Sequence, residues 1–150
     1  AAMREIIRHD VPLAPSTREL LDALARDGAR LAVGSSAPPE NVDLVLDGGG
    51  IRSRFAAAVD GSQVKRGKPA PDVFLLAAER IGLPPSACAV IEDAPAGIRA
   101  AVAAGMTAIG LTTTHTREQL LEAGATVIYA DMPALSPALI RAAITAAVRS

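Results

Sequence analysis

Short apolar runs alternate with amphipathic stretches along nearly the whole chain, and this alternation limits the folds that the chain can adopt. Five runs have the length and composition of buried strands, at residues 29–34, 55–59, 87–91, 107–111 and 125–129. Strands that are apolar on both faces are typical of a parallel sheet, because the crossover helices cover each side. The sequence therefore predicts a doubly wound, three-layer α/β/α fold with a Rossmann-like parallel sheet.

Helix boundary signals lie between these runs. Thr116 and Gln119 have the spacing of a capping box, and Gly124 follows at the expected end of that helix. Pro71 suits the first turn of a helix that Gly82 ends. Doubly wound sheets bind their ligands outside the carboxyl ends of the strands, so the residues that follow each apolar run are the candidates for chemistry.

Composition excludes several classes of function. The net charge is −1, from 15 basic and 16 acidic residues, which argues against general nucleic-acid binding, and 2% aromatic residues leave no base-stacking platform. No apolar run is long enough to span a bilayer, so we expect no membrane partner. The single cysteine, Cys88, forbids an internal disulfide and indicates a cytoplasmic location.

Two hydroxyl groups follow the first apolar run. Ser35 and Ser36 come directly after Gly34, and Pro38 and Pro39 then open a helix. The free N–H groups at the start of such a helix favour an anion, which makes the two serines candidate phosphate ligands. Ser36 would equally serve as the cap of that helix, and the residues alone leave both interpretations open.

A lysine lies in a segment that two prolines stiffen. Pro69 directly follows Lys68 and Pro71 comes two residues later, so the backbone around the lysine would aim its side chain. The segment also contains Lys65 and Arg66, and such a run is more often an exposed charged loop. It is not a nucleotide-binding P-loop, because a proline follows the lysine and no glycine has the required spacing.

Two adjacent carboxylates end the third apolar run. Glu92 and Asp93 would repel each other there, so they need a cation or strong hydrogen-bond donors to remain ionised. A pair of carboxylates of this kind is a candidate binding site for a divalent metal ion. The alternative is that Asp93 caps the next helix and Glu92 is a solvated end residue, which is the usual meaning of an isolated pair.

Taken in order, these segments resemble the haloacid dehalogenase (HAD) superfamily of phosphohydrolases, in the branch of β-phosphoglucomutase and small sugar-phosphate phosphatases. Residues 32–36, 66–74 and 91–101 carry the resemblance, which extends over roughly residues 12–130. Each segment lies at an expected strand end, and this context makes the match specific. The resemblance implies the HAD-like core fold.

It also implies a role for each candidate residue. Ser35 would hydrogen-bond the transferring phosphoryl oxygens with the help of Ser36, and Lys68 would neutralise the phosphate charge. Asp93 would bind Mg²⁺, and Glu92 would be a further metal ligand or a partner just outside the metal's ligands. The implied activity is Mg²⁺-dependent hydrolysis of a small phosphorylated metabolite, such as a sugar phosphate, through an aspartyl-phosphate.

One part of the family pattern is absent. The family's nucleophile is the first aspartate of Asp-x-Asp-Gly-Thr/Ser, and its nearest counterpart here, Val59-Asp60-Gly61-Ser62, has Ala58 where that aspartate would stand. We interpret Asp60 as the turn after its strand. We expect a preceding segment of the same protein to supply the nucleophile, on a central strand that the sheet would otherwise lack.

The domain boundaries follow from this expectation. Residues 1–14 are predicted to be the end of a helical cap, with a short helix within 1–9, and a linker, and residues 15–150 the C-terminal portion of the core. The chain alone would then have no turnover. Two alternatives to the phosphatase remain open, a sugar phosphomutase and a non-catalytic scaffold on the same fold. His115, in a polar loop, is interpreted as a surface residue and left outside the site.

Overall fold

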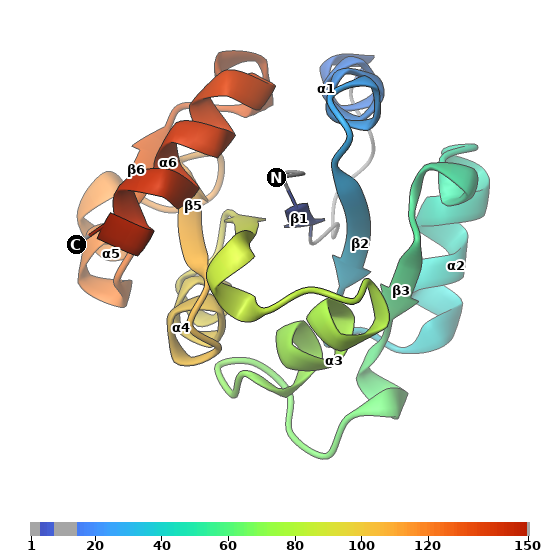
Figure 1. Cartoon of the computed structure of the whole chain (residues 1–150). Coiled ribbons are helices and arrows are strands. Elements are labelled where there is room, and N and C mark those ends of the chain that lie inside the picture. The colour runs from blue at the N-terminus through green and yellow to red at the C-terminus, as the bar shows by residue number, and fades with distance from the viewer. Residues whose placement is uncertain (1–3, 8–14, 150) are drawn as a thin grey trace.

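Six parallel strands form one sheet in the order β3-β2-β1-β4-β5-β6 (Figure 1). The computed structural model describes residues 4–7 and 15–149 of the chain. The strands are β1 (Arg4–Ile7), β2 (Arg30–Gly34), β3 (Ala57–Val59), β4 (Cys88–Glu92), β5 (Thr107–Leu111) and β6 (Val127–Tyr129). The strand order reverses between β1 and β4, which makes the carboxyl ends of the central strands the expected ligand-binding edge.

Helices cover both faces of this sheet. They are α1 (Pro15–Arg26), α2 (Pro39–Gly48), α3 (Asp72–Arg80), α4 (Pro95–Ala103), α5 (Arg117–Ala123) and α6 (Pro137–Arg149). Short 3₁₀ turns lie at Arg52–Arg54, Gly61–Gln63, Pro85–Ala87 and Met132–Ala134. None of the helices in the described part of the chain has the length and apolar character needed to cross a membrane.

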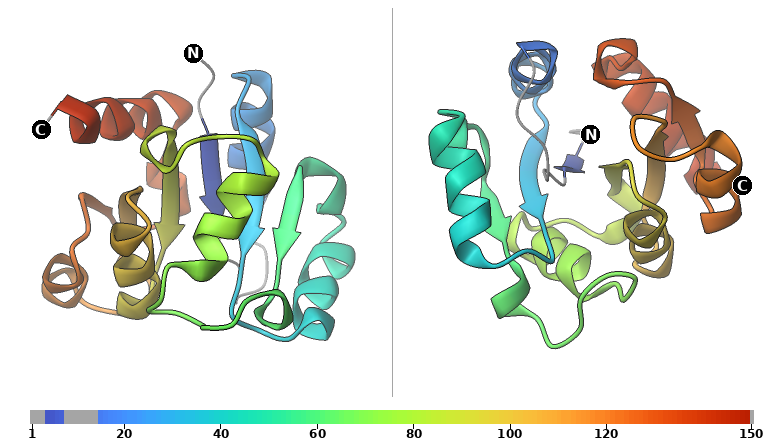
Figure 2. Two further views of the ribbon diagram at one scale, coloured as in Figure 1. Left: turned by 60° about the horizontal axis from the view of Figure 1, so that its bottom comes forward. Right: turned by 180° about the vertical axis from the view of Figure 1, so that it is seen from behind.

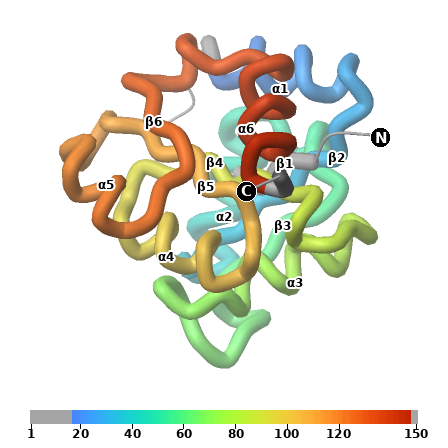
Figure 3. The backbone as a smooth tube through the Cα atoms, turned by 60° about the vertical axis from the view of Figure 1, so that its left-hand side comes forward, coloured from blue at the N-terminus to red at the C-terminus, as the bar shows by residue number. Residues whose placement is uncertain are grey.

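Alternate residues of β2, β3, β4, β5 and β6 enter two separate hydrophobic cores. Ala32, Val90 and Ala108 point to the core under α3, α4 and α5, whereas Val33 and Ile91 point to the core under α1, α2 and α6. Figure 2 shows α3 against one face of the strands, and Figure 3 shows α1 and α6 together, away from α3 and α4. Burial on both faces of the sheet explains why the strand sequences are continuous apolar runs.

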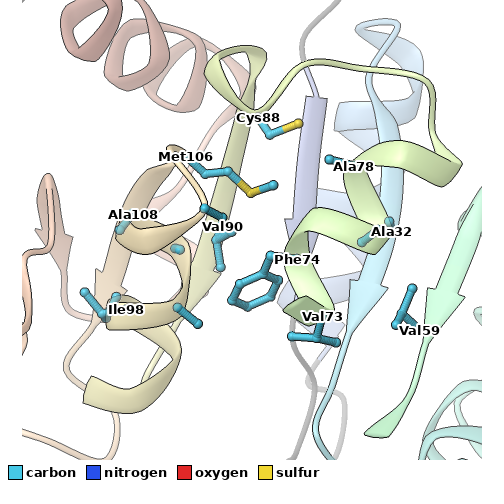
Figure 4. Packing of buried hydrophobic residues seen from close by; sticks show 14 of the residues in the cluster. Ala32, Val59, Val73, Phe74, Ala78, Cys88, Val90, Ile98, Met106 and Ala108 are labelled. Carbon is cyan, nitrogen blue, oxygen red and sulfur yellow. The ribbon is translucent and has the colours of Figure 1, made fainter. Parts of the chain in front are cut away.

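The first core also supports the ligand-binding edge. Phe74 of α3 is fully buried and gathers with Val90 of β4 and Ile98 of α4 (Figure 4). α3 and α4 both begin at the carboxyl edge of the sheet, so this packing fixes the loops that precede the two helices. Those loops carry Lys68 and Asp93.

The predicted doubly wound α/β/α fold is confirmed, and each of the five predicted strands is present. β5 has the predicted bounds, β2 begins one residue later than predicted, and β4 both begins and ends one residue later. β3 is shorter than predicted. A 3₁₀ turn occupies Arg52–Arg54 with Phe55 as its C-terminal cap, so the strand begins only at Ala57. β6 begins at Val127 rather than at residue 125.

The expected helix within residues 1–9 is wrong for Arg4–Ile7, which form β1 at the centre of the sheet. The expected gap at that position is therefore filled. β1 pairs with both β2 and β4, and without it the backbone groups along both neighbours would lack ladder partners. The segment contains two β-branched residues, Ile6 and Ile7, which favour a strand. The four residues of β1 include no aspartate. The predicted linker at residues 10–14 lies outside the described residues.

A capping box fixes the loop between β5 and α5, as predicted. Thr116 N donates to Gln119 Oε1 over 2.9 Å, and Gln119 N donates to Thr116 Oγ1 over 3.2 Å. Gly124, with φ of 109°, ends the helix in the left-handed conformation. The cap directly follows Thr114 and His115, so it holds that part of the loop near the carboxyl edge of the sheet.

Replacing Thr116 with alanine should destabilise the protein by about 1 kcal/mol, because Gln119 N loses its acceptor. Thr116→Ser should retain most of the stability, since its hydroxyl can still accept this bond. Free energies of unfolding from urea titrations test both. Equal losses for Ala and Ser would show that the threonine methyl group, and not the cap, matters.

Candidate active site

The site lies at the carboxyl edge of the sheet, around the end of β1. Ser35 directly follows β2, and Glu92 is the last residue of β4. Lys68 reaches the same place from the loop that precedes α3. β2 and β4 are the two neighbours of β1, so the residues predicted from separate segments converge at the position where the strand order reverses.

The Lys68 side chain is buried and held by oxygen atoms. Its Nζ donates to Gly34 O over 3.1 Å and to Glu92 Oε2 over 3.3 Å. It also lies 4.7 Å from the centre of the Phe74 ring, within the range of a cation–π contact. Only 5% of the side chain is exposed, so the interpretation of Lys68 as part of a solvated charged loop is wrong.

Glu92 faces the protein interior. Its side chain is fully buried, and its Oε1 accepts hydrogen bonds of 3.2 Å from Asp93 N and Ala94 N. These N–H groups lie at the start of α4, where the helix dipole favours a negative charge. The ammonium of Lys68 adds a direct countercharge, so Glu92 is not the solvated end residue of the alternative interpretation.

The two serines differ in their contacts. Ser35 is buried, and its Oγ accepts from Ala37 N over 3.0 Å. Ser36 Oγ accepts from Lys68 N over 3.0 Å, and the residue at the cap of α2 is Pro38. Ser36 therefore does not cap that helix. It connects the loop after β2 to the loop that carries the lysine.

Close backbone packing holds these loops together. Gly61 N donates to Ala37 O over 2.8 Å, and a Cβ atom at Gly61 would lie 2.3 Å from Ser36 O. Only glycine allows this approach. Asp60 caps the 3₁₀ turn at Gly61–Gln63, with Ser62 N and the Gln63 side chain in a capping box, so its predicted place in a turn is confirmed.

Asp93 is half-buried at the mouth of the site. The cap residue of α4 is Ala94, so the interpretation of Asp93 as the helix cap is wrong. Thr114 Oγ1 lies 3.2 Å from both Asp93 Oδ2 and Asp93 O. His115 Nδ1 lies 3.2 Å from Asp93 O and 2.9 Å from Thr114 Oγ1. His115, interpreted from the sequence as a surface residue outside the site, therefore lies against Asp93, and only its position after β5 indicated this in the sequence.

The oxygen atoms at this edge suit part of a magnesium site. Mg²⁺ prefers oxygen ligands, and proteins often hold it with one or two carboxylates, water and substrate phosphate. The Asp93 carboxylate offers oxygen atoms of this kind. Within the described ranges, no group of three or more His, Cys, Asp or Glu residues could hold a metal ion. Because Glu92 contacts Lys68, we expect Glu92 to lie beside the residues that would bind the metal.

Comparisons with known proteins agree with this geometry. A family model described as haloacid dehalogenase-like hydrolase matches residues 2–105, which is more than half of the chain. The protein SUPPRESSOR OF QUENCHING 1, chloroplastic, from Arabidopsis thaliana is 41% identical over 81% of the chain and 12% of its own length. Fructose-1-phosphate phosphatase YqaB from Escherichia coli is 47% identical over 53% of the chain and 42% of its own length.

A solved structure shares the fold over most of the chain. β-Phosphoglucomutase from Clostridium difficile superposes with a TM-score of 0.81 and 26% identity, over 92% of the chain and 59% of the other protein. The chain spans 12% to 48% of the length of the first curated relatives that it matches.

Removal of one member of the buried pair should be strongly destabilising. Lys68→Met should cost about 3–5 kcal/mol, because it takes away the ammonium that Glu92 Oε2 contacts. The double variant Lys68→Met with Glu92→Gln should cost less than the sum of the two single variants, since the buried negative charge is then also gone. Urea unfolding of the four proteins measures this coupling.

Arg66→Met provides the matched control. Arg66 pairs with Asp72, but 71% of its side chain is exposed, so its loss should cost less than about 1 kcal/mol. A cost for Lys68→Met as small as that for Arg66→Met would contradict the structural role of the buried pair.

Proposed function

The chain belongs to the haloacid dehalogenase-like hydrolases, and we propose that it provides the phosphate- and metal-binding part of an enzyme that hydrolyses a small phosphorylated metabolite. One observation carries this proposal. The buried Lys68 ammonium lies at the switch point of the sheet, fixed by Gly34 O and Glu92, in the loop that Ser36 ties to the end of β2.

The charge of the substrate explains why a fixed cation is needed. A phosphomonoester carries about two negative charges near neutral pH, and these repel an anionic nucleophile. Lys68 would attract a phosphate oxygen and lower this repulsion. Its contacts hold the ammonium in place before the substrate arrives, so little reorganisation is needed during phosphoryl transfer.

Ser35 would bind a second side of the phosphoryl group. Its hydroxyl accepts a bond from Ala37 N, which leaves the hydroxyl proton able to point toward a phosphate oxygen. Ser36 would contribute through the backbone N–H groups of the loop, because its own Oγ accepts from Lys68 N. Both serines thus take part in the proposed phosphate cradle.

Asp93 would hold Mg²⁺ at the mouth of the site. A bound Mg²⁺ would supply Lewis-acid stabilisation of the phosphoryl oxygens. Thr114 Oγ1, 3.2 Å from Asp93 Oδ2, would orient the Asp93 carboxylate. Glu92 would support the site from the protein interior, where it contacts Lys68 and the N–H groups that directly precede α4.

The attacking group would be an aspartate from a segment that precedes these residues in the intact protein, and the strand of that segment would take the central place that β1 occupies between β2 and β4. Its carboxylate oxygen would attack phosphorus and release the alcohol of the substrate. Water would then hydrolyse the resulting aspartyl-phosphate and release inorganic phosphate. The described residues would supply the binding groups for this reaction, and β1 contains no aspartate.

The substrate that we propose is a sugar phosphate. The relative YqaB is named a fructose-1-phosphate phosphatase, and it is 47% identical to this chain over 53% of the chain's length. We also propose a cytoplasmic location, because the only cysteine is the buried Cys88 and no disulfide stabilises the fold.

A phosphomutase is the second candidate, and the structural similarity to β-phosphoglucomutase favours it. Both reactions would use the same phosphate and metal groups. They differ in the fate of the phosphoryl group, which goes to water in a phosphatase and returns to another sugar hydroxyl in a mutase. Product analysis after incubation with a hexose phosphate separates them.

The proposal predicts Mg²⁺-dependent phosphate release from an aryl phosphate by the intact protein, and no turnover by residues 1–150 alone. Lys68→Ala and Asp93→Ala should each lower kcat/KM by about 10²–10³-fold, since each removes a charge that stabilises the transferring group. A malachite-green assay of released phosphate measures these rates. Asp93→Ala should also abolish the dependence on Mg²⁺.

Asp43→Ala is a suitable control, because Asp43 pairs with Arg52 on the surface of the protein. Its rates should equal those of the unchanged protein. Equal activity of Asp93→Ala and the unchanged protein would contradict the metal role. Absence of activity in every intact protein, with sugar phosphates as well as aryl phosphates, would favour a non-catalytic scaffold.

A further inference from the structure

Gly97 stands inside α4 at a position where its own backbone does not require glycine. It is buried in the first turn of the helix, and its φ does not lie in the left-handed region. Glycine inside a helix is destabilising by roughly 0.5–1 kcal/mol relative to alanine. Another contact must therefore account for a glycine at this position.

That contact is the side chain of Glu92. A Cβ atom at Gly97 would lie 2.1 Å from both Glu92 Cδ and Glu92 Oε2, and 2.3 Å from Glu92 Cγ. Rotation of the carboxylate alone cannot relieve the overlap, because Cγ is also too close. The Glu92 side chain is fully buried, so it has no solvent-filled space into which it can move.

We propose that Gly97 is a positioning residue that sets where the Glu92 carboxylate lies, and through it where the Lys68 ammonium lies. The absence of a Cβ lets the carboxylate lie against the first turn of α4. There Oε1 accepts from Asp93 N and Ala94 N while Oε2 contacts Lys68 Nζ. The consequence for catalysis rests on the proposed function, whereas the steric relation does not.

A methyl group at residue 97 would break this chain of contacts. Glu92 would have to withdraw from α4, and its Oε2 would leave Lys68 Nζ. Lys68 would then shift relative to Gly34 O and to the Phe74 ring, 4.7 Å from its Nζ. The substitution therefore acts at Lys68 without touching it directly.

Thermal unfolding of residues 1–150 tests the steric relation. Gly97→Ala should lower the Tm by about 5–10 °C, although alanine favours a helix. In a Glu92→Ala background the same substitution should leave the Tm unchanged or raise it, because the clashing side chain is gone. Glu92→Asp, which is shorter by one methylene, should restore part of the loss.

Gly48→Ala is the matched control. Gly48 is also helical, at the end of α2, and a Cβ there has no atom within 4 Å. Its Tm should not fall. An equal loss for Gly97→Ala in the presence and absence of the Glu92 side chain would overturn the proposal, and so would the absence of any loss.

NMR of lysine side chains tests the effect on Lys68. The chain contains only two lysines, so lysine-selective ¹³C labelling gives two sets of signals, and the exposed Lys65 is an internal reference. The Lys68 Hε signals should lie upfield of those of Lys65, because of the Phe74 ring. In Gly97→Ala they should move, and Lys65 should not. Unchanged Lys68 signals would contradict the positioning role.

The intact enzyme provides the catalytic readout. Gly97→Ala should lower kcat by about 10-fold or more with a smaller change in KM, and Gly48→Ala should change neither. If no variant of the intact protein hydrolyses phosphomonoesters, the proposed function fails while the Tm and NMR results still decide the role of Gly97. Full activity of Gly97→Ala would overturn that role in catalysis.

Discussion

The buried pair between Lys68 and Glu92 is the interaction on which the site depends. It joins the loop before α3 to the end of β4, and both side chains are almost completely removed from water. Such a pair is costly to desolvate and is retained only with good partners. Gly34 O, the N–H groups of Asp93 and Ala94, and the Phe74 ring supply them. The result is a cation held at a fixed position at the end of β2.

The parallel sheet makes this convergence possible. The loop after β2, the loop before α3 and the end of β4 are distant in sequence, but the strand order brings them to one edge. Glycines then allow the final approach. Gly61 lets its loop pack against Ser36, and Gly97 leaves room for the Glu92 carboxylate. Positions without a side chain are thus as important to the geometry as the charged residues.

The fold could be predicted from the sequence, because apolar runs mark doubly buried strands. The convergence of the candidate residues at one edge could also be predicted, because the carboxyl ends of parallel strands meet there. The contacts could not. Whether Ser36 caps a helix or binds Lys68 N depends on loops more than 30 residues apart, and only the structure brings them together. β1 was not predicted, because the charged residues Arg4 and Glu5 obscure the strand pattern. The place of His115 beside Asp93 was not predicted either, because this contact links two loops that are separate in the sequence.

The central claim is that the buried lysine, and not the exposed one, meets the phosphate. The most direct measurement is a titration of the intact protein, labelled with ¹³C-lysine and ¹⁵N-serine, with inorganic phosphate in the presence of Mg²⁺. The account predicts saturable shifts of the Lys68 signals and of the Ser35 amide, with Lys65 unchanged. Shifts confined to Lys65, or no response at Lys68 under conditions in which the enzyme is active, would contradict it.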